Sequence, residues 1–116
     1  MTIQRFETGP RMSQAVVHGN TVYLAGQVAQ KAAGKSVTDQ TRDILETIDK
    51  LLAGAGSDKS KLLSAQIFLT DIATFIEMNK VWEAWVSPGN TPARATVEAK
   101  LAAPQYTVEI MVVAAR

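Results

Sequence analysis

The sequence contains no cysteine and a single histidine, His18. Without cysteine there is no disulfide framework, no thiolate metal ligand and no cysteine nucleophile. One histidine is too few for the usual zinc sites, which take several ligands from the protein. His18 lies beside the Gly19-Asn20 turn and is interpreted as a solvated turn residue. The sequence therefore points away from thiol and zinc chemistry, and no metal site is expected.

A charge excess and long apolar runs are also lacking. The chain has 12 lysines and arginines against 11 aspartates and glutamates, a formal net charge of +1, and only the Lys31–Lys35 stretch approaches a basic cluster. Such a chain gives no reason to expect nucleic acid as a partner. No apolar run approaches the ~20 residues of a membrane span, and the first residues lack the apolar core of a signal peptide. We expect a cytoplasmic protein without a membrane partner.

Length and composition are those of one ordinary globular unit. The chain has 116 residues, of which 47% are hydrophobic and 20% charged. It is long enough to bury a core but small for an enzyme that works alone. Because no repeat, low-complexity tract or linker interrupts it, we expect residues 1–116 to form a single domain.

Extended segments are predicted near both ends of the chain. Residues 2–8 suit a short edge strand that ends at the Gly9-Pro10 breaker. Ser13–His18 and Thr21–Ala29 flank a Gly-Asn turn and predict a hairpin, whose second arm is apolar on both faces apart from Gln27. Further strands are expected at residues 62–70, 93–99 and 107–114.

The clearest helix is predicted over Thr38–Ala55. Apolar residues recur there at helical spacing, while charged residues take the opposite face. Thr38 or Asp39 is the expected N-cap, and Gly54 or Gly56 is expected to end the helix.

A second helix is predicted to begin near Asp71–Thr74 and to stop at Ser87-Pro88-Gly89. Thr74 and Glu77 have the spacing of a capping box. The residues expected to point inward from this helix are Phe75, Met78, Val81, Trp82 and Trp85.

These elements predict a two-layer α+β domain with a mixed sheet. Two helices cover only one face of a sheet of about six strands. The strand from Val108 to Ala114 is nevertheless apolar on both faces apart from Glu109. An uncovered apolar face needs a partner, and the simplest partner is another copy of the chain. We expect the domain to oligomerise through its sheet.

Arg94 is the first residue that could carry chemistry. Strand alternation puts Arg94, Thr96 and Glu98 on one face. A guanidinium there can form a bidentate pair with a ligand carboxylate, which lysine cannot reproduce. The alternative is a structural ion pair with Glu98 or with an acid of another subunit.

Glu109 is the second residue that could carry chemistry, since it lies in the most apolar strand of the chain. A carboxylate in such a strand must be paired, hydrogen-bonded or neutralised. Desolvation would raise its pKa, which suits a general acid or base. The alternative is again an ion pair, with Arg94 itself, within one subunit or across an interface.

Motifs along nearly the whole chain resemble those of one family. The N-terminal motifs are Gly9-Pro10, Ser13-Gln14-Ala15-Val16, Gly19-Asn20-Thr21-Val22-Tyr23 and Ala25-Gly26-Gln27. The later motifs are Gln40-Thr41 through Leu51, Gly54-Ala55-Gly56, Pro92-Ala93-Arg94, Val97-Glu98 and Val108-Glu109-Ile110. In this order they are similar to those of the RidA/YjgF family.

The resemblance implies a chorismate-mutase-like fold, assembled as a homotrimer with ligand clefts between subunits. It also implies cofactor-independent hydrolysis of reactive imines or enamines, such as 2-aminoacrylate, to a 2-keto acid and ammonia. By this resemblance Arg94 would hold the substrate carboxylate and Glu109 would orient or activate the attacking water. Gly26 and the backbone around Thr96 would line the substrate-binding pocket.

Three positions depart from the family pattern. Ala25 replaces a frequent serine, Met12 stands where a tyrosine is common, and Thr96 replaces a frequent cysteine. The first two changes make one edge of the substrate-binding pocket less polar. They motivate a second hypothesis, a non-catalytic trimer that binds a small carboxylate through Arg94. RNA cleavage is a third hypothesis. It fits poorly with a near-neutral chain that lacks metal ligands.

Overall fold

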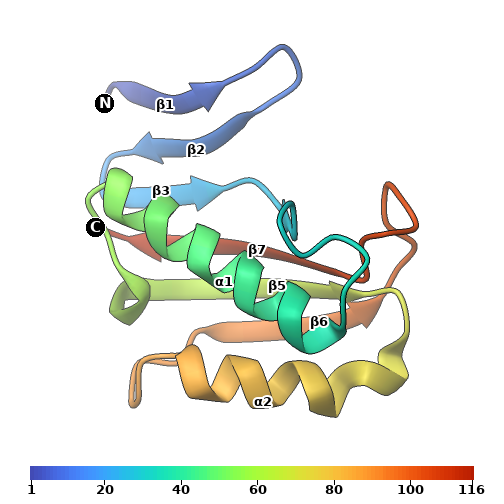
Figure 1. Cartoon of the computed structure of the whole chain (residues 1–116). Coiled ribbons are helices and arrows are strands. Elements are labelled where there is room, and N and C mark those ends of the chain that lie inside the picture. Colours follow the sequence, from blue (N-terminus) through green and yellow to red (C-terminus); the bar gives the residue numbers. More distant parts are fainter.

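The computed structural model describes all 116 residues, with a mixed sheet as one layer and two helices as the other (Figure 1). The strands are β1 (Ile3–Thr8), β2 (Ser13–His18), β3 (Thr21–Leu24), β4 (Gln27–Val28), β5 (Leu62–Leu69), β6 (Ala93–Glu98) and β7 (Val108–Ala115). The helices are α1 (Val37–Gly54) and α2 (Phe75–Trp85), and two short 3₁₀ turns are η1 (Lys59–Lys61) and η2 (Ile72–Thr74).

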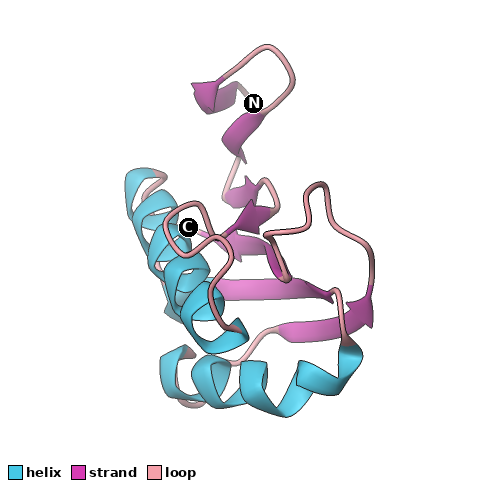
Figure 2. Cartoon of the chain, turned by 45° about the vertical axis from the view of Figure 1, so that its right-hand side comes forward, coloured by secondary structure: helices cyan, strands magenta, loops and turns pink.

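The sheet has the order β1-β2-β3-β7-β5-β6, and β4 also pairs with β7. Its neighbours are antiparallel except for β5 and β6, which run parallel. Figure 2 shows both helices on the same side of the sheet, with the β1–β2 hairpin reaching beyond them. The expected α+β class, with a mixed sheet and helices on one face, is confirmed. Neither helix combines the length and apolarity that crossing a membrane requires.

The expected continuous strand from Thr21 to Ala29 is interrupted at Ala25-Gly26. β3 pairs with the end of β7 through Tyr23 and Val113, whereas β4 pairs near its start. Between them the N–H of Ala25 donates to the carbonyl oxygen of Gln14 instead of to β7. The prediction of one unbroken arm was therefore wrong, and the break proves important for the site.

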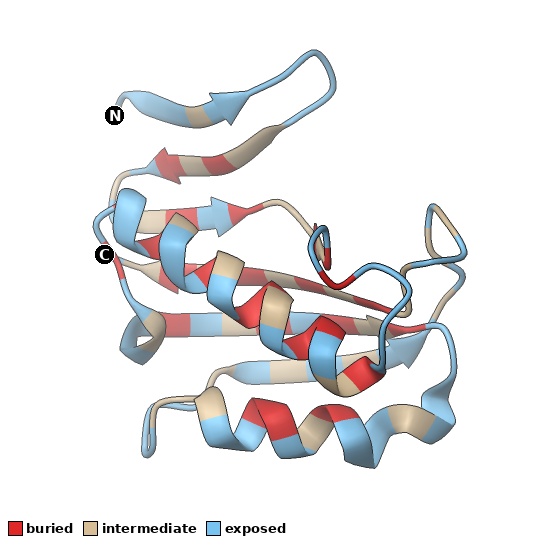
Figure 3. Ribbon diagram, in the orientation of Figure 1, coloured by how far each residue is buried: buried red, intermediate tan, exposed pale blue.

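The two faces of β7 differ in cover (Figure 3). Val108, Ile110, Val112 and Ala114 are at most 1% exposed and face the helices. The intervening residues, from Glu109 to Ala115, are half-buried on the open face. Buried apolar residues from both layers form one core cluster. On α2, Met78, Val81 and Trp82 are buried as predicted, whereas Phe75 remains exposed and Trp85 is half-buried.

α1 begins at a different N-cap from the predicted one, whereas α2 has the predicted N-cap, Thr74, without the predicted capping bonds. Ser36 is the N-cap of α1, and its hydroxyl oxygen accepts from the N–H of Asp39 at 3.1 Å. Thr38 is engaged elsewhere, because its N–H and hydroxyl both donate to Glu77 Oε2 at 2.9 Å. Glu77 thus links the two helices, and Thr74 makes no side-chain capping bond. The capping box expected from Thr74 and Glu77 does not form.

Candidate functional site

The side chain of Arg94 lies between the edge strand β6 and helix α2. Its Nη1 donates to Asn79 Oδ1 at 2.8 Å. The guanidinium carbon is 5.4 Å from the ring centroid of Trp82 and 5.7 Å from that of Phe75, so both rings offer cation–π contact. Residues 75, 79 and 82 are spaced by four and three and therefore share one face of α2. This face of α2 fixes the position of the guanidinium.

Arg94 is a partly desolvated cation without an ion-pair partner in the chain. Desolvation lowers the pKa of Arg94, and the charge of Glu83 opposes that shift. The only ion pair within 4.0 Å in the chain joins Lys50 and Glu46. The alternative of a structural pair with Glu98 is thus not formed within the chain, since Glu98 accepts from the N–H of Ile72. Arg94 has five N–H donors, and the chain uses only one of them.

Thr96 follows Arg94 on the same face of β6, as the alternation predicted. Its Oγ1 is buried and has no hydrogen-bond partner. An unsatisfied buried hydroxyl is unusual in a folded protein because it forfeits its hydrogen bond to water. The surroundings of Arg94 therefore hold both unused donors and an unused hydroxyl.

Glu109 lies on the open face of β7, opposite Val28 of β4 and Phe68 of β5. Its carboxylate rests against the break between β3 and β4. A Cβ atom added to Gly26 would overlap Glu109 Oε2 and lie 3.0 Å from its Cδ, so only glycine allows this approach. No hydrogen bond within the chain uses the N–H of Gly26. A carboxylate and a free backbone donor therefore lie side by side.

Arg94 and Glu109 of one chain do not meet. β5 separates their strands, and Arg94 is level with Ala65 while Glu109 is level with Phe68. Neighbouring strands lie about 4.8 Å apart, so their backbones are about 10 Å apart or more. The two side chains also leave opposite faces of the sheet. An ion pair between them within one subunit is ruled out by this geometry.

The other sequence-predicted site residues divide between these two places. Ala25 and Gly26 lie beside Glu109, and Thr96 lies beside Arg94. Met12 lies in the turn between β1 and β2 and is 54% exposed. The sequence reasoning missed Asn79 and Phe75, although their spacing with Trp82 on a predicted helix was a usable signal. Trp82, which was expected to point inward from the second helix, is buried and also contacts Arg94.

The family model described as Endoribonuclease L-PSP matches residues 2–116. The chain belongs to this RutC/YjgF/L-PSP family. A RutC family protein of Haemophilus influenzae is 46% identical over 98% of both chains. The RutC family protein YoaB of Escherichia coli is 45% identical over 99% of both. A crystal structure of a YjgF family member from Neisseria meningitidis superimposes with a TM-score of 0.97 at 46% identity, covering 100% of this chain and 96% of that one. The fold of the RutC/YjgF family, chorismate-mutase-like in class, is therefore also the fold of this chain.

Proposed function

We propose that this RutC/YjgF family protein is a cofactor-independent imine/enamine deaminase. Its substrates are 2-aminoacrylate-like imino acids, and its products are 2-keto acids and ammonia. The observation that carries the proposal is the guanidinium of Arg94, which is partly desolvated, held by α2 and free of ion-pair partners in the chain. Such a group suits bidentate binding of a substrate carboxylate.

Glu109 supplies the proton transfers in this proposal. An imine that carries a proton on nitrogen is already electrophilic, so hydrolysis requires positioning and a base rather than a metal. Glu109 takes a proton from water as the water oxygen bonds to the imine carbon. It then returns that proton to nitrogen. As the carbon–nitrogen bond breaks, the hydroxyl proton passes to the Glu109 carboxylate, a carbonyl group forms, and ammonia leaves and takes that proton from Glu109 as ammonium, so that the carboxylate is restored. The free N–H of Gly26 is a donor for an oxygen of the bound substrate.

We further propose that each site forms between two copies in a homotrimer. One copy contributes Arg94 and the next contributes Glu109, because the two residues of one chain leave opposite sheet faces. The open face supports this arrangement, since Tyr23 and Val97 stay exposed on it beside half-buried Met111. An apolar sheet face of this kind favours association.

The first test uses imino acids generated in situ by an amino-acid oxidase or a dehydratase. Wild type is expected to accelerate imine loss. Arg94→Ala is expected to lower kcat/KM by about 100-fold, mainly through KM, and Arg94→Lys is not expected to restore it. Glu109→Gln is expected to lower kcat by about 100-fold. Lys50→Gln removes a charge from the exposed side of α1 and serves as the control. No acceleration by a folded, assembled wild type on any imino acid contradicts the proposal.

A mixing experiment tests whether the site is shared. Arg94→Ala and Glu109→Gln chains are unfolded together in equal amounts and refolded. In a mixed trimer one of the three interfaces combines an intact Arg94 with an intact Glu109, so about a quarter of wild-type activity is expected. Each variant refolded alone is expected to stay inactive. A mixture as inactive as its components would place both residues of a working site in one subunit.

The alternative is a non-catalytic trimer that binds a small carboxylate through Arg94. It is motivated by the absence of hydroxyl groups at Met12 and Ala25. Calorimetry that finds tight, Arg94-dependent binding of a 2-keto acid without any imine turnover supports it. RNA cleavage that survives rigorous purification and disappears in Arg94→Ala would displace both proposals.

A further inference from the structure

A groove of about 430 Å³ runs between α1 and α2 on the solvent side of the helical layer. An interhelical contact lies near each end. Near the start of both helices, Thr38 donates to Glu77 Oε2. Near their ends, Trp85 Nε1 donates to Asp49 Oδ2 at 3.0 Å. The groove is therefore held at a defined width by hydrogen bonds between side chains of the two helices.

The base of the groove is apolar. Leu45 of α1 and Val81 of α2 are buried there, and Ala84 and the half-buried ring of Trp85 continue the surface. Trp85 also makes a tilted contact with Trp82, at 5.4 Å between ring centroids. A flat apolar group laid along this base would stack on an indole ring that is already fixed.

Three cations border the groove. Arg42 follows Thr38 by four residues and Lys80 follows Glu77 by three, so both lie one helical turn inside the same end. Lys59 lies at the other end, with Nζ 5.4 Å from the Trp85 ring centroid. None of the three has a carboxylate within 4.0 Å, because the only ion pair in the chain joins Lys50 and Glu46.

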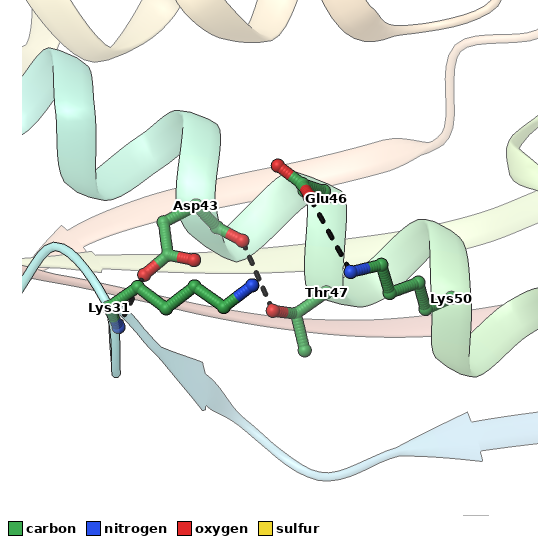
Figure 4. A network of polar contacts seen from close by, with 5 residues as sticks. All are labelled: Lys31, Asp43, Glu46, Thr47 and Lys50. Carbon is green, nitrogen blue, oxygen red and sulfur yellow. Dashed lines mark hydrogen bonds and ion pairs between the residues drawn. The ribbon is translucent and has the colours of Figure 1, made fainter.

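The carboxylates around the groove already have donors. Glu46 accepts from Lys50 at 3.5 Å on the surface of α1 (Figure 4). Asp49 accepts from the indole N–H, and Glu77 accepts from the backbone and hydroxyl of Thr38. The carboxylates of Asp49 and Glu77 keep their charge but are held by these neutral donors, so Arg42, Lys59 and Lys80 remain without an ion-pair partner above an apolar base.

We propose that this groove binds a small aromatic anion. Its carboxylate or phosphate lies between Arg42 and Lys80, and its ring lies on Val81 and Trp85. The site is separate from Arg94, which contacts a different face of α2, and it does not depend on the deaminase proposal. Charge supplies orientation here, and the apolar base supplies most of the contact.

Fluorine NMR of protein labelled with 5-fluorotryptophan tests the proposal, because the chain has only 2 tryptophans. Trp82→Phe and Trp85→Phe assign the two resonances. Phenyl phosphate is expected to shift the Trp85 resonance saturably and that of Trp82 far less. Benzyl alcohol, which lacks the charge, and inorganic phosphate, which lacks the ring, are each expected to bind about tenfold more weakly. Phenylacetate in the same titration shows whether the groove prefers phosphate or carboxylate.

Exposed residues allow a matched set of variants. The double variant Arg42→Gln, Lys80→Gln is expected to weaken phenyl phosphate binding by about tenfold or more. Lys61→Gln, in the same η1 turn as Lys59 but outside the groove, is expected to match wild type. An unchanged Trp82 resonance in each variant shows that the fold is retained. A Trp85 resonance that phenyl phosphate does not move, or equal affinity in the double variant, overturns the proposal.

Discussion

The two faces of the sheet are similar in residue type and differ in what covers them. On the helix face, the alternate residues from Val108 to Ala114 are at most 1% exposed, because α1 and α2 pack on the sheet there. On the open face, Tyr23 and Val97 keep 48% and 47% of their surface exposed. The chain completes one apolar face by itself and leaves the other without cover.

The same contrast separates the two parts of the candidate site. Arg94 belongs to the covered side, where Asn79 and Trp82 fix its guanidinium. Glu109 belongs to the open side, between Val28 and Phe68 and against the break at Gly26, and no helix covers it. One side of the proposed chemistry is therefore organised within the chain, and the other depends on what covers the open face. Four experiments test this contrast.

The largest effect is expected from a charge on the open face. Val113→Asp puts a carboxylate among apolar neighbours that a partner copy would bury, and desolvation then opposes association. Sedimentation velocity is expected to show monomers, and the proposed deaminase activity is expected to be absent while the circular dichroism spectrum is kept. Ala33→Asp, in an exposed loop, is the control. If Val113→Asp stays assembled like wild type, the open face is not the interface.

The next largest effect is expected from a cavity on the covered face. Ile110 is fully buried, so Ile110→Ala is expected to cost about 2–5 kcal/mol of unfolding free energy. Val97→Ala on the open face is expected to cost less than about 1 kcal/mol. Ile110→Ala and Val97→Ala are both measured by urea unfolding in the Val113→Asp background, where assembly does not contribute to stability. Equal costs at the two positions would mean that the faces do not differ as described.

Periodicity alone was enough to predict these faces. The alternation of β6 put Arg94, Thr96 and Glu98 together, and in the structure they pair with Ala65, Ile67 and Leu69, which face the helices. The run from Val108 to Ala114 likewise predicted a strand with two apolar faces. Alternation is a local property of an extended chain, so it can be read without knowing the neighbours.

The contacts that organise the site were not local, and the sequence did not reveal them. Asn79 meets Arg94 only because α2 packs along β6. Glu77 has the spacing of a capping box with Thr74 but binds Thr38, which lies 39 residues away along the chain. At the break, the carboxylate of Glu109 from another strand occupies the space that a Cβ atom of residue 26 would take. Each depends on how elements pack, which short motifs do not specify.

A smaller effect is expected from Gly26→Ala, which tests the open side of the site. The new methyl group would overlap the carboxylate of Glu109, so the carboxylate must move away from the water that it is proposed to activate. We expect kcat to fall by about tenfold, with KM nearly unchanged. Gly54→Ala is the control, because a Cβ there meets nothing within 4 Å and an α-helix favours alanine by about 0.5–1 kcal/mol. Equal kcat values for the two variants would separate Gly26 from catalysis.

The smallest effect is expected on the covered side, from Asn79→Ala. The change removes one hydrogen bond to Arg94 and leaves the contacts with Trp82 and Phe75. Because Arg94 is proposed to hold the substrate carboxylate in both ground and transition states, KM is expected to rise about three- to tenfold with kcat within about twofold. Asn79→Asp supplies a charged partner that competes with the substrate, so its KM is expected to be higher still. A fall in kcat at constant KM would instead mean that the guanidinium acts at the reacting carbon, and the division of roles between the two faces would have to be reversed.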